Sequence, residues 1–349
     1  MDIGTISSGA SVMISKESPN QHLIISGISG VGKSVRIFDI ERCIIEAGGT
    51  VIAFDMNGTH SNVEGGWFNY ISAQEDGLDV KFLDTALVES GKETLTNMIQ
   101  YVVETLCPRQ LRGACQLATV RKAIQFAIKN KQDFSCEMDA IAYGLKEQDD
   151  AASLGAYNHL CPILEGKIFR KSRKRIVEDR VNVISLKGLN PKTQKRVLEI
   201  MLAVIWKKLR SEGVSKSKFT LILDEFQNLD FDKETAFFQM LTEARKYGVN
   251  MILATQTLSI FSRKELAIIN QAAVKLYFQQ SVSDVKTVSG MIDLKHREKW
   301  ISGLSQLKVG QAITVGAFEI NGRQIRQPII TYSDYGEATK LICSKPESR

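Results

Sequence analysis

The chain has 349 residues, of which 44% are hydrophobic and 24% are charged, and its formal net charge is +6. This balance is typical of a globular protein and excludes a disordered or fibrous chain. No apolar run approaches the roughly 18 residues that a membrane-spanning helix needs, so we expect a cytoplasmic protein with no membrane span. The six cysteines form no CxxC pair, which argues against a zinc site or a disulfide framework.

Apolar runs and helical patterns alternate along the first part of the chain. Residues 22–26 and 50–54 are predicted strands. Between them, residues 34–47 have the apolar spacing of a helix, and a pair of glycines follows as the expected helix end. This order of elements is typical of a βαβ unit.

Helical spacing without a convincing strand continues from residue 93 to 166, which predicts a helical insertion. Four further apolar strands follow it, with helical stretches between them. Nearly continuous apolar strands that alternate with helices predict a parallel sheet covered on both faces. The predicted strands are residues 181–186, 219–223, 250–254 and 273–278, and the predicted helices are residues 193–209 and 233–247.

A glycine-rich loop follows the first predicted strand. It matches the pattern GxxxxGK[ST] and lies between a strand and a helix, the context that a phosphate-binding loop requires. Backbone N–H groups would face the phosphates, Lys33 would reach the β- and γ-phosphates, and the Ser34 hydroxyl would bind Mg²⁺. The alternative, a glycine-rich turn with a chance lysine, leaves this context unexplained. The predicted nucleotide-binding residues are Gly27, Ile28, Ser29, Gly30, Val31, Gly32, Lys33, Ser34 and Val35.

An acidic pair follows the predicted strand at residues 219–223. Asp224 is placed to hold Mg²⁺, and Glu225 to accept a proton from the attacking water or orient it, which turns nucleotide binding into hydrolysis. The alternative for Glu225 is an acid placed at a helix N-terminus for the helix dipole. Gln256 follows the next strand, at the edge where ligands bind in such sheets, and would sense the γ-phosphate. The alternative for Gln256 is a solvated strand end.

Two short motifs are typical of a GTPase instead. A DxxG occurs at residues 55–58 and an NKxD at residues 130–133. However, the DxxG follows the lysine of the glycine-rich loop by only 22 positions, which leaves no room for a switch loop. The NKxD follows a stretch of helical period rather than a buried strand. An ABC-type ATPase is also disfavoured, because its nearest signature, at residues 301–306, comes after the acidic pair instead of before it.

Segments of the chain also occur in a characteristic order, namely residues 20–34, 51–55, 181–189, 221–229, 243–248, 252–259 and 309–312. This order resembles the ATPase domain of the HerA/FtsK superfamily over roughly residues 5 to 330, and HerA-like proteins are the most similar members. The resemblance implies an α/β, RecA-like P-loop fold with a mostly parallel central sheet and a helical insertion. It also implies ATP and Mg²⁺ as ligands, a homo-oligomeric, hexameric ring, and ATP-driven translocation along double-stranded DNA.

The alternation of strand and helix patterns divides the chain into three regions. Residues 1–92 would form the N-terminal part of the ATPase core, residues 93–166 the helical insertion, and residues 167–349 the C-terminal part of the core. The implied function is a DNA motor that works with a nuclease or another effector protein. The alternative is an ATP-gated scaffold of a multiprotein complex that does not move DNA.

The resemblance also suggests a role for one arginine, and this sequence differs from the family pattern at two points. Arg245 falls where family members carry basic residues near the subunit interface, and would contact the γ-phosphate of a neighbouring subunit; alternatively it is an arginine that the helix C-terminus favours. Many relatives continue the second strand as Asp-x-x-Gly-Glu, whereas Thr59 and His60 follow Gly58 here. Archaeal HerA also carries an N-terminal β-barrel, whereas the glycine-rich loop begins at Gly27 in this sequence, so ring assembly or partner docking is expected to differ.

Translocation needs basic residues that follow the phosphate backbone without reading bases. A segment just before the strand at residues 181–186 is rich in them, although such a charge run is also typical of a solvated face. The lysine-rich stretch at residues 207–218 is the second candidate. The predicted DNA-contacting residues are Lys167, Arg170, Lys171, Arg173, Lys174 and Arg175.

Overall fold

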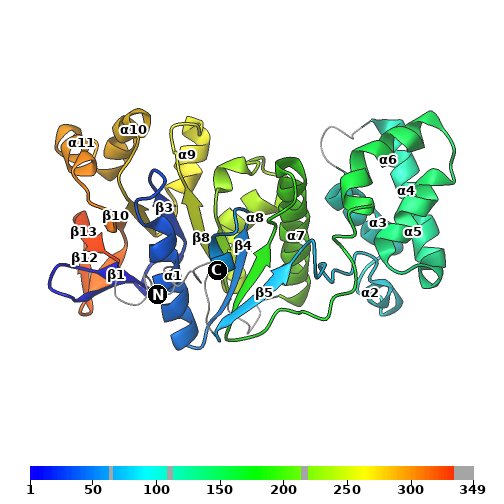
Figure 1. The fold of residues 1–349 in the computed structure, drawn as a ribbon, viewed down its shortest axis with the longest axis horizontal. Coiled ribbons are helices and arrows are strands. Elements are labelled where there is room, and N and C mark those ends of the chain that lie inside the picture. The colour runs from blue at the N-terminus through cyan, green and yellow to red at the C-terminus, as the bar shows by residue number, and fades with distance from the viewer. Residues whose placement is uncertain (63–65, 108–112, 214–218, 334–349) are drawn as a thin grey trace, which may run out of the picture. The chain divides into compact units, whose positions relative to one another are not determined.

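The computed structural model describes residues 1–62, 66–107, 113–213 and 219–333 (Figure 1). The chain divides into two compact units. Unit 1 comprises Met1–Tyr70, Ile176–Ile184 and the chain from Glu212 onward, and unit 2 comprises Ile71–Arg175 and Ser185–Ser211.

The described strands form one sheet, almost all of it in unit 1, in the order β12-β11-β2-β1-β13-β10-β9-β3-β8-β7-β4-β6-β5. The strands are β1 (Asp2–Thr5), β2 (Ser11–Ile14), β3 (Leu23–Ser26), β4 (Thr50–Asp55), β5 (Phe68–Ser72), β6 (Val181–Ser185), β7 (Phe219–Leu223), β8 (Val249–Thr255), β9 (Val274–Tyr277), β10 (Gln311–Gly316), β11 (Phe318–Ile320), β12 (Arg323–Ile325) and β13 (Ile329–Tyr332).

The centre of this sheet is parallel. Strand β3 lies between β8 and β9 and is parallel to both, and β7 is parallel to both β8 and β4. These central strands are buried nearly along their whole length, as expected for parallel strands that helices cover. The predicted α/β fold with a mostly parallel central sheet is therefore confirmed, and the carboxyl ends of β3, β4, β7 and β8 share one edge.

The helices of unit 1 connect and cover these strands. Helix α1 follows the glycine-rich loop and packs against β1 and β4. The helical segments are α1 (Lys33–Glu46), α8 (Ala236–Glu243), α9 (Arg263–Ile269), α10 (Val282–Ile292) and α11 (Arg297–Ser305), with short 3-10 turns η1 (Thr59–Asn62), η3 (Phe226–Asn228) and η4 (Ala244–Tyr247).

The sheet also has an antiparallel part that the sequence analysis did not predict. Strands β10, β13, β1, β2, β11 and β12 extend the sheet beyond β9, each antiparallel to its neighbour. Strand β1 pairs with β13, which joins the first residues of the chain to a strand more than 300 positions later. The segment before the glycine-rich loop is thus an integral part of the sheet.

Arg36 on α1 anchors this antiparallel part. Its side chain is fully buried, and its guanidinium donates hydrogen bonds to the carbonyl oxygens of Ile3 (2.6 Å) and Gly310 (3.2 Å) and to the Ser333 hydroxyl (2.8 Å). It also lies over the ring of Phe278. A buried cation requires such partners, so α1 is tied to strands from both ends of the chain.

Unit 2 is built mainly from helices. The residues between 93 and 166 that the structure assigns to regular elements are helical, as predicted. Unit 2 extends beyond this insertion, to Ile71 and Ser211, and the three-part division of the chain stays a prediction. The helices are α2 (Thr85–Glu89), α3 (Leu95–Leu106), α4 (Ala114–Asn130), α5 (Glu137–Lys146), α6 (Ala151–Leu164) and α7 (Pro191–Glu212, whose last residue belongs to unit 1).

Two helix starts in unit 2 follow from local sequence. The Thr94 side chain accepts a hydrogen bond from the backbone of Asn97 and begins α3. Asp150 and Ser153 form a reciprocal capping box at the start of α6. Within the described part of the chain no helix is long and apolar enough to span a membrane, and no disulfide joins the described cysteines; Cys343 lies outside the described residues.

Candidate nucleotide-binding site

The glycine-rich loop joins the carboxyl end of β3 to the start of α1. Gly30 and Gly32 have φ angles of 81° and 99°, which only glycine adopts readily, so the loop can curl at these positions. The backbone N–H of Ile28 donates to the carbonyl of Gln279 and holds the loop against the segment after β9. Among the described residues no side chain caps the N-terminus of α1, and its first turn carries no acid. The backbone N–H groups at this helix start, which no side chain caps, fit a bound phosphate.

Lys33 lies in this loop as predicted. Its ammonium donates to the loop's own carbonyl oxygens, Gly27 at 2.6 Å and Ile28 at 2.8 Å. Burial lowers the pKa of Lys33, and the charges of Asp224 and Glu225 oppose this shift. The lysine is therefore within electrostatic range of the predicted acidic pair.

The acidic pair lies at the carboxyl end of β7. Burial, with the neighbouring charge of Glu225, raises the pKa of Asp224 to about 6, although Lys33 and the hydrogen bond from the Glu225 N–H work against it. Glu225 itself has a left-handed backbone, with φ 55° and ψ 40°. Such a conformation is uncommon for a non-glycine residue. The chain therefore turns sharply just after the strand, and the side chains of Asp224 and Glu225 leave the backbone in different directions.

Gln256 contacts Glu225 directly. The Gln256 amide donates to one carboxylate oxygen of Glu225, and the Gln227 amide donates to the other. Gln227 in turn accepts a hydrogen bond from the Thr255 hydroxyl (2.7 Å) at the end of β8. The structure thus brings together two residues that the sequence analysis placed at neighbouring strand ends, and their catalytic roles stay predictions.

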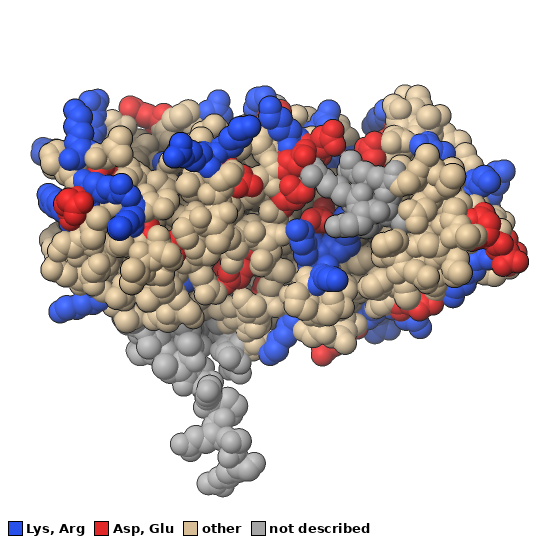
Figure 2. Space-filling model, turned by 90° about the horizontal axis from the view of Figure 1, so that it is seen from above, with Lys and Arg blue, Asp and Glu red and all other residues tan. Residues whose placement is uncertain are grey.

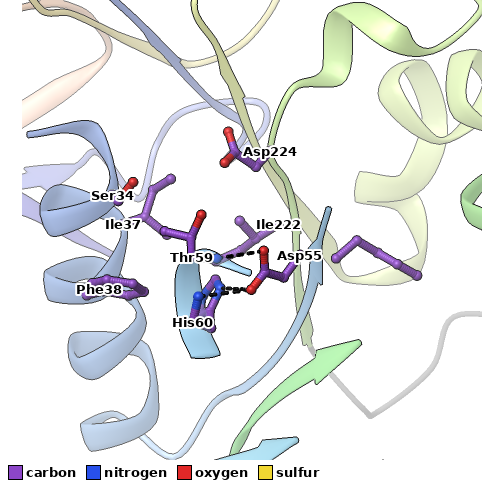
Figure 3. A pocket seen from close by; sticks show the side chains of 9 residues that line it. Ser34, Ile37, Phe38, Asp55, Thr59, His60, Ile222 and Asp224 are labelled. Carbon is purple, nitrogen blue, oxygen red and sulfur yellow. Dashed lines mark hydrogen bonds and ion pairs between the residues drawn. The ribbon is translucent and has the colours of Figure 1, made fainter. Parts of the chain in front are cut away.

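Ser34 and Asp224 line one pocket, drawn in Figure 3. Ser34 comes from α1 and Asp224 from β7, and the loop after β4 closes the other side. A hydroxyl and a carboxylate oxygen in one pocket fit Mg²⁺, which prefers oxygen ligands. The lining residues are Ser34, Ile37, Phe38, Phe54, Asp55, Thr59, His60, Ile222 and Asp224.

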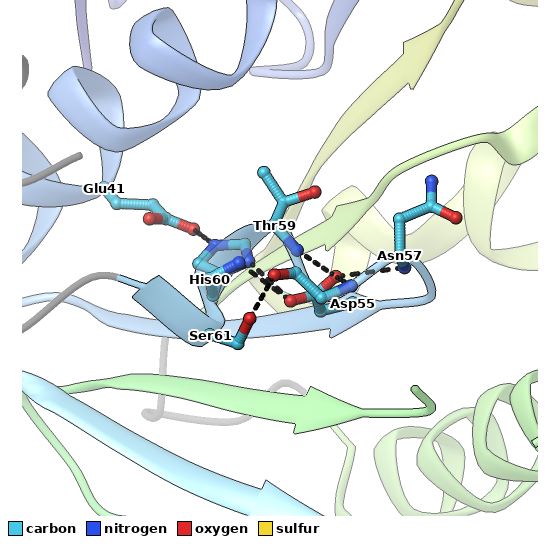
Figure 4. A network of polar contacts seen from close by, with 7 residues as sticks. Glu41, Asp55, Asn57, Thr59, His60 and Ser61 are labelled. Atoms are coloured by element: carbon cyan, nitrogen blue, oxygen red, sulfur yellow. Dashed lines mark hydrogen bonds and ion pairs between the residues drawn. The ribbon is translucent and has the colours of Figure 1, made fainter. Parts of the chain in front are cut away.

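The loop after β4 holds polar contacts that the sequence analysis did not assign (Figure 4). The His60 ring lies 3.0 Å from Glu41 through Nε2, and 3.4 Å from Asp55 through Nδ1. Burial alone would lower the pKa of His60, but the two carboxylates outweigh it and raise the pKa to about 10. The sequence analysis noted His60 only as a departure. The aspartate at the strand end was the available signal in the sequence, whereas the burial of Glu41 is seen only in the structure.

Arg245 lies away from the loop of its own chain. It is exposed in η4, just before the amino end of β8, and donates to the carbonyl oxygen of Pro19, which precedes β3. The parallel strands β3 and β8 therefore carry Arg245 at one edge and the glycine-rich loop at the other. Contact with a neighbouring subunit stays a prediction.

The predicted DNA-contacting segment lies in unit 2. Ile168 and Phe169 are buried and fix the segment, whereas its cations differ in their contacts. Arg170 donates to the carbonyl oxygens of Gln74 and Glu75, and Lys174 forms an ion pair with Asp76 at 2.9 Å. Among the described residues, no ion pair is found for the exposed Lys171 and Arg173, and Lys167 and Arg175 are also exposed.

On the face drawn in Figure 2 the basic side chains do not form one continuous area, because acidic and neutral side chains lie between them. In the second predicted stretch, Lys207 forms an ion pair with Glu93 at 3.0 Å. Residues 214–218 of that stretch lie outside the described residues.

The NKxD motif lies in unit 2, where Asn130 ends helix α4 and residues 131–133 form a 3-10 turn. The motif thus does not follow a strand of the sheet. Asp55 of the DxxG accepts hydrogen bonds from the backbone of its own loop. The position of the NKxD motif at a helix end argues against a GTPase.

Comparisons with solved structures identify the fold. Among solved structures, the fold resembles VirB4 of Thermoanaerobacter pseudethanolicus, with a TM-score of 0.67 and 14% identity over 97% of this chain and 98% of that one. It also resembles the plasmid coupling protein TrwB bound to a GTP analogue, with a TM-score of 0.65 and 14% identity over 95% and 89% of the two chains. At such identities the likeness establishes the RecA-like fold alone. No curated protein sequence matches the chain significantly.

The model of the family described as helicase HerA, central domain, matches residues 1–209. This match covers more than half of the chain and includes the glycine-rich loop. The chain therefore belongs to the HerA central-domain family of P-loop ATPases.

Proposed function

We propose that this protein is an ATP-hydrolysing, ring-forming motor that moves double-stranded DNA. The contact between Gln256 and Glu225, at the edge of the sheet that also carries the phosphate-binding loop, is the observation that carries the proposal. In this proposal Glu225 is the base, Gln256 is the γ-phosphate sensor, and their contact supports a joint role. The solved complexes of TrwB with an ATP analogue and with ADP and Mg²⁺ support a Mg²⁺-nucleotide ligand on this fold.

In this proposal each site residue has a separate task. The N-terminus of α1 and Lys33 bind the phosphates, with the lysine leaving its own loop carbonyls for the β- and γ-oxygens. Ser34 and Asp224 hold Mg²⁺, which neutralises the charge that develops on the phosphates. Glu225 orients a water molecule and accepts its proton, and Gln256 holds the carboxylate in place.

A ring would complete the site. Arg245 is exposed at the edge of the sheet opposite its own loop, so its guanidinium is available to a neighbouring subunit. An arginine supplied in this way stabilises the charge on the transferred phosphoryl group. DNA would contact the exposed cations between Lys167 and Arg175, and a nuclease or another effector would act on the DNA that the motor delivers.

The proposal is tested by the ATPase rate with and without duplex DNA, measured over several duplex lengths and salt concentrations, together with the solution mass. A motor predicts a rate that rises with duplex length and falls steeply with added salt. A hexamer predicts a mass six times that of the chain. An ATPase rate that does not respond to DNA of any length would favour the ATP-gated scaffold instead. A preference for GTP would argue against the assigned substrate.

A further inference from the structure

The loop after β4 is folded around one carboxylate. Asp55 accepts four backbone hydrogen bonds, from Asn57 (3.2 Å), Gly58 (2.7 Å), Thr59 (3.0 Å) and His60 (2.9 Å). These bonds stabilise the ionised carboxylate and fix the path of the loop around it. The loop then has little freedom of its own, so the position of the His60 side chain is defined by Asp55.

His60 joins this loop to helix α1. Its ring is 3.0 Å from Glu41 of α1 and 3.4 Å from Asp55, and it packs edge-on against Phe38 of the same helix. Glu41 is fully buried, and its second carboxylate oxygen has no hydrogen-bond partner within the described residues. His60 is therefore the group that compensates the charge of Glu41, and removing it would leave two buried carboxylates facing each other.

This bridge connects the two sides of the Mg²⁺ pocket. Lys33 and Ser34 lie in the first turn of α1, two turns before Glu41. On the other side, β4 is parallel to β7 with Phe54 opposite Leu223, so the next residues, Asp55 and Asp224, lie at neighbouring strand ends. Both acids and His60 line the pocket with Ser34 (Figure 3).

We propose that His60 is a positioning residue for the metal half of the nucleotide site. By holding Glu41 to Asp55, it keeps α1 and its Ser34 at a fixed distance from Asp224, the two groups that would share the Mg²⁺. This inference rests on the proposed function, because it assumes that Mg²⁺ is bound with the nucleotide.

The test is equilibrium binding of a fluorescent, non-hydrolysable ATP analogue to the full chain, titrated with Mg²⁺ and repeated in EDTA. His60→Gln is compared with the wild type and with the matched control His296→Gln, which removes an exposed histidine that contacts Asp293 at 2.7 Å. We expect His60→Gln to need about tenfold more Mg²⁺ for half-maximal tight binding, as for other supporting residues around a metal site. Its affinity in EDTA and the whole titration of His296→Gln should match the wild type.

If His60 only stabilised the fold, the substitution would reduce the amount of folded protein. The folded molecules would still need the wild-type concentration of Mg²⁺ for half-maximal binding. An unchanged midpoint in His60→Gln would therefore overturn the inference. If that variant does not fold, Glu41→Gln/His60→Gln removes the unpaired carboxylate together with the imidazole and is measured in its place, with the same raised midpoint expected. A wild-type protein that binds no nucleotide would instead refute the proposed function, so the two failures are distinguishable.

Discussion

The nucleotide-binding edge of unit 1 and the basic segment of unit 2 use charge in different ways. At the nucleotide edge, Lys33, Asp224 and Glu225 are partly buried and each meets a specific polar partner. In the basic segment, Lys171 and Arg173 are exposed. Partly buried charges interact strongly with their neighbours, because little water or salt screens them. Each exposed charge interacts only weakly with a ligand, so several must add up to bind it. Substitutions in the first region should thus have large, local effects, and those in the second small, salt-dependent ones.

The largest effect is expected for Lys33→Ala. The Lys33 ammonium bonds the carbonyl oxygens of its own loop and would exchange them for the phosphate oxygens, and hydrogen bonds from a charged group are strong. We expect nucleotide affinity to fall by about 100-fold, measured by titration calorimetry with an ATP analogue and Mg²⁺. The matched control Lys264→Ala removes an exposed lysine from α9 and should bind as the wild type does. Equal affinities for all three proteins would contradict the assigned loop.

The second largest effect is expected for His60→Gln, on the stability of the folded protein. Removing one partner from a buried ionic group leaves the remaining charge uncompensated, which costs about 3 kcal/mol. The free energy of unfolding, measured by urea denaturation, should fall by about that amount. His296→Gln should unfold at the same urea concentration as the wild type, because its ion pair is exposed. If His60→Gln lowers the free energy of unfolding by less than about 1 kcal/mol, a group other than His60 must compensate the charge of Glu41.

The same residue predicts a dependence on pH. The pKa of His60 is raised to about 10 by Glu41 and Asp55, the two carboxylates that face it, from an ordinary value of 6.5. Below pH 6.5 the imidazole is protonated in both the folded and the unfolded chain, and its full contribution to stability is present. As the pH rises toward 10, the unfolded chain loses this proton first, so the contribution falls by up to about 1.4 kcal/mol per pH unit.

Other buried groups titrate in this range, and burial lowers the pKa of Lys275 to about 8. The informative quantity is therefore the difference in unfolding free energy between the wild type and His60→Gln at each pH. That difference should be largest near pH 6 and shrink steadily toward pH 10. A difference that stays constant with pH would show that His60 is neutral in the folded protein.

The smallest effect is expected for Lys171→Ala/Arg173→Ala in the basic segment. Each cation that contacts a phosphate releases close to one counterion, so the salt dependence of DNA binding should weaken by a slope of up to about 2. The ATPase rate without DNA should not change. The double variant Arg263→Ala/Lys264→Ala removes the same charge from the exposed surface of α9 and serves as the control. An identical salt slope in both double variants would exclude the basic segment from the DNA interface.

The nucleotide site could be predicted because its signals are local. The glycine-rich loop needs eight consecutive residues, and the acidic pair follows directly on an apolar strand. The contact between Glu225 and Gln256 spans 31 positions, but both residues end neighbouring parallel strands, and polar side chains at such ends meet at one edge.

The antiparallel strands could not be predicted in the same way. Strands β11 and β12 have three residues each, too few to show an apolar alternation, and β1 finds its partner β13 at the other end of the described chain. The contact between His60 and Glu41 could not be predicted either. It depends on which face of α1 is turned toward the loop after β4, and Glu41, a charged residue, gives no sign in the sequence that it is fully buried.

The central claim is that Glu225 turns nucleotide binding into hydrolysis. It is tested most directly by measuring both ATP binding and steady-state ATP turnover for the wild type and Glu225→Gln, a change that keeps the size of the side chain. The account predicts that Glu225→Gln binds Mg²⁺ and ATP as tightly as the wild type but hydrolyses ATP roughly a hundredfold more slowly or worse. Turnover by Glu225→Gln at the wild-type rate would contradict it.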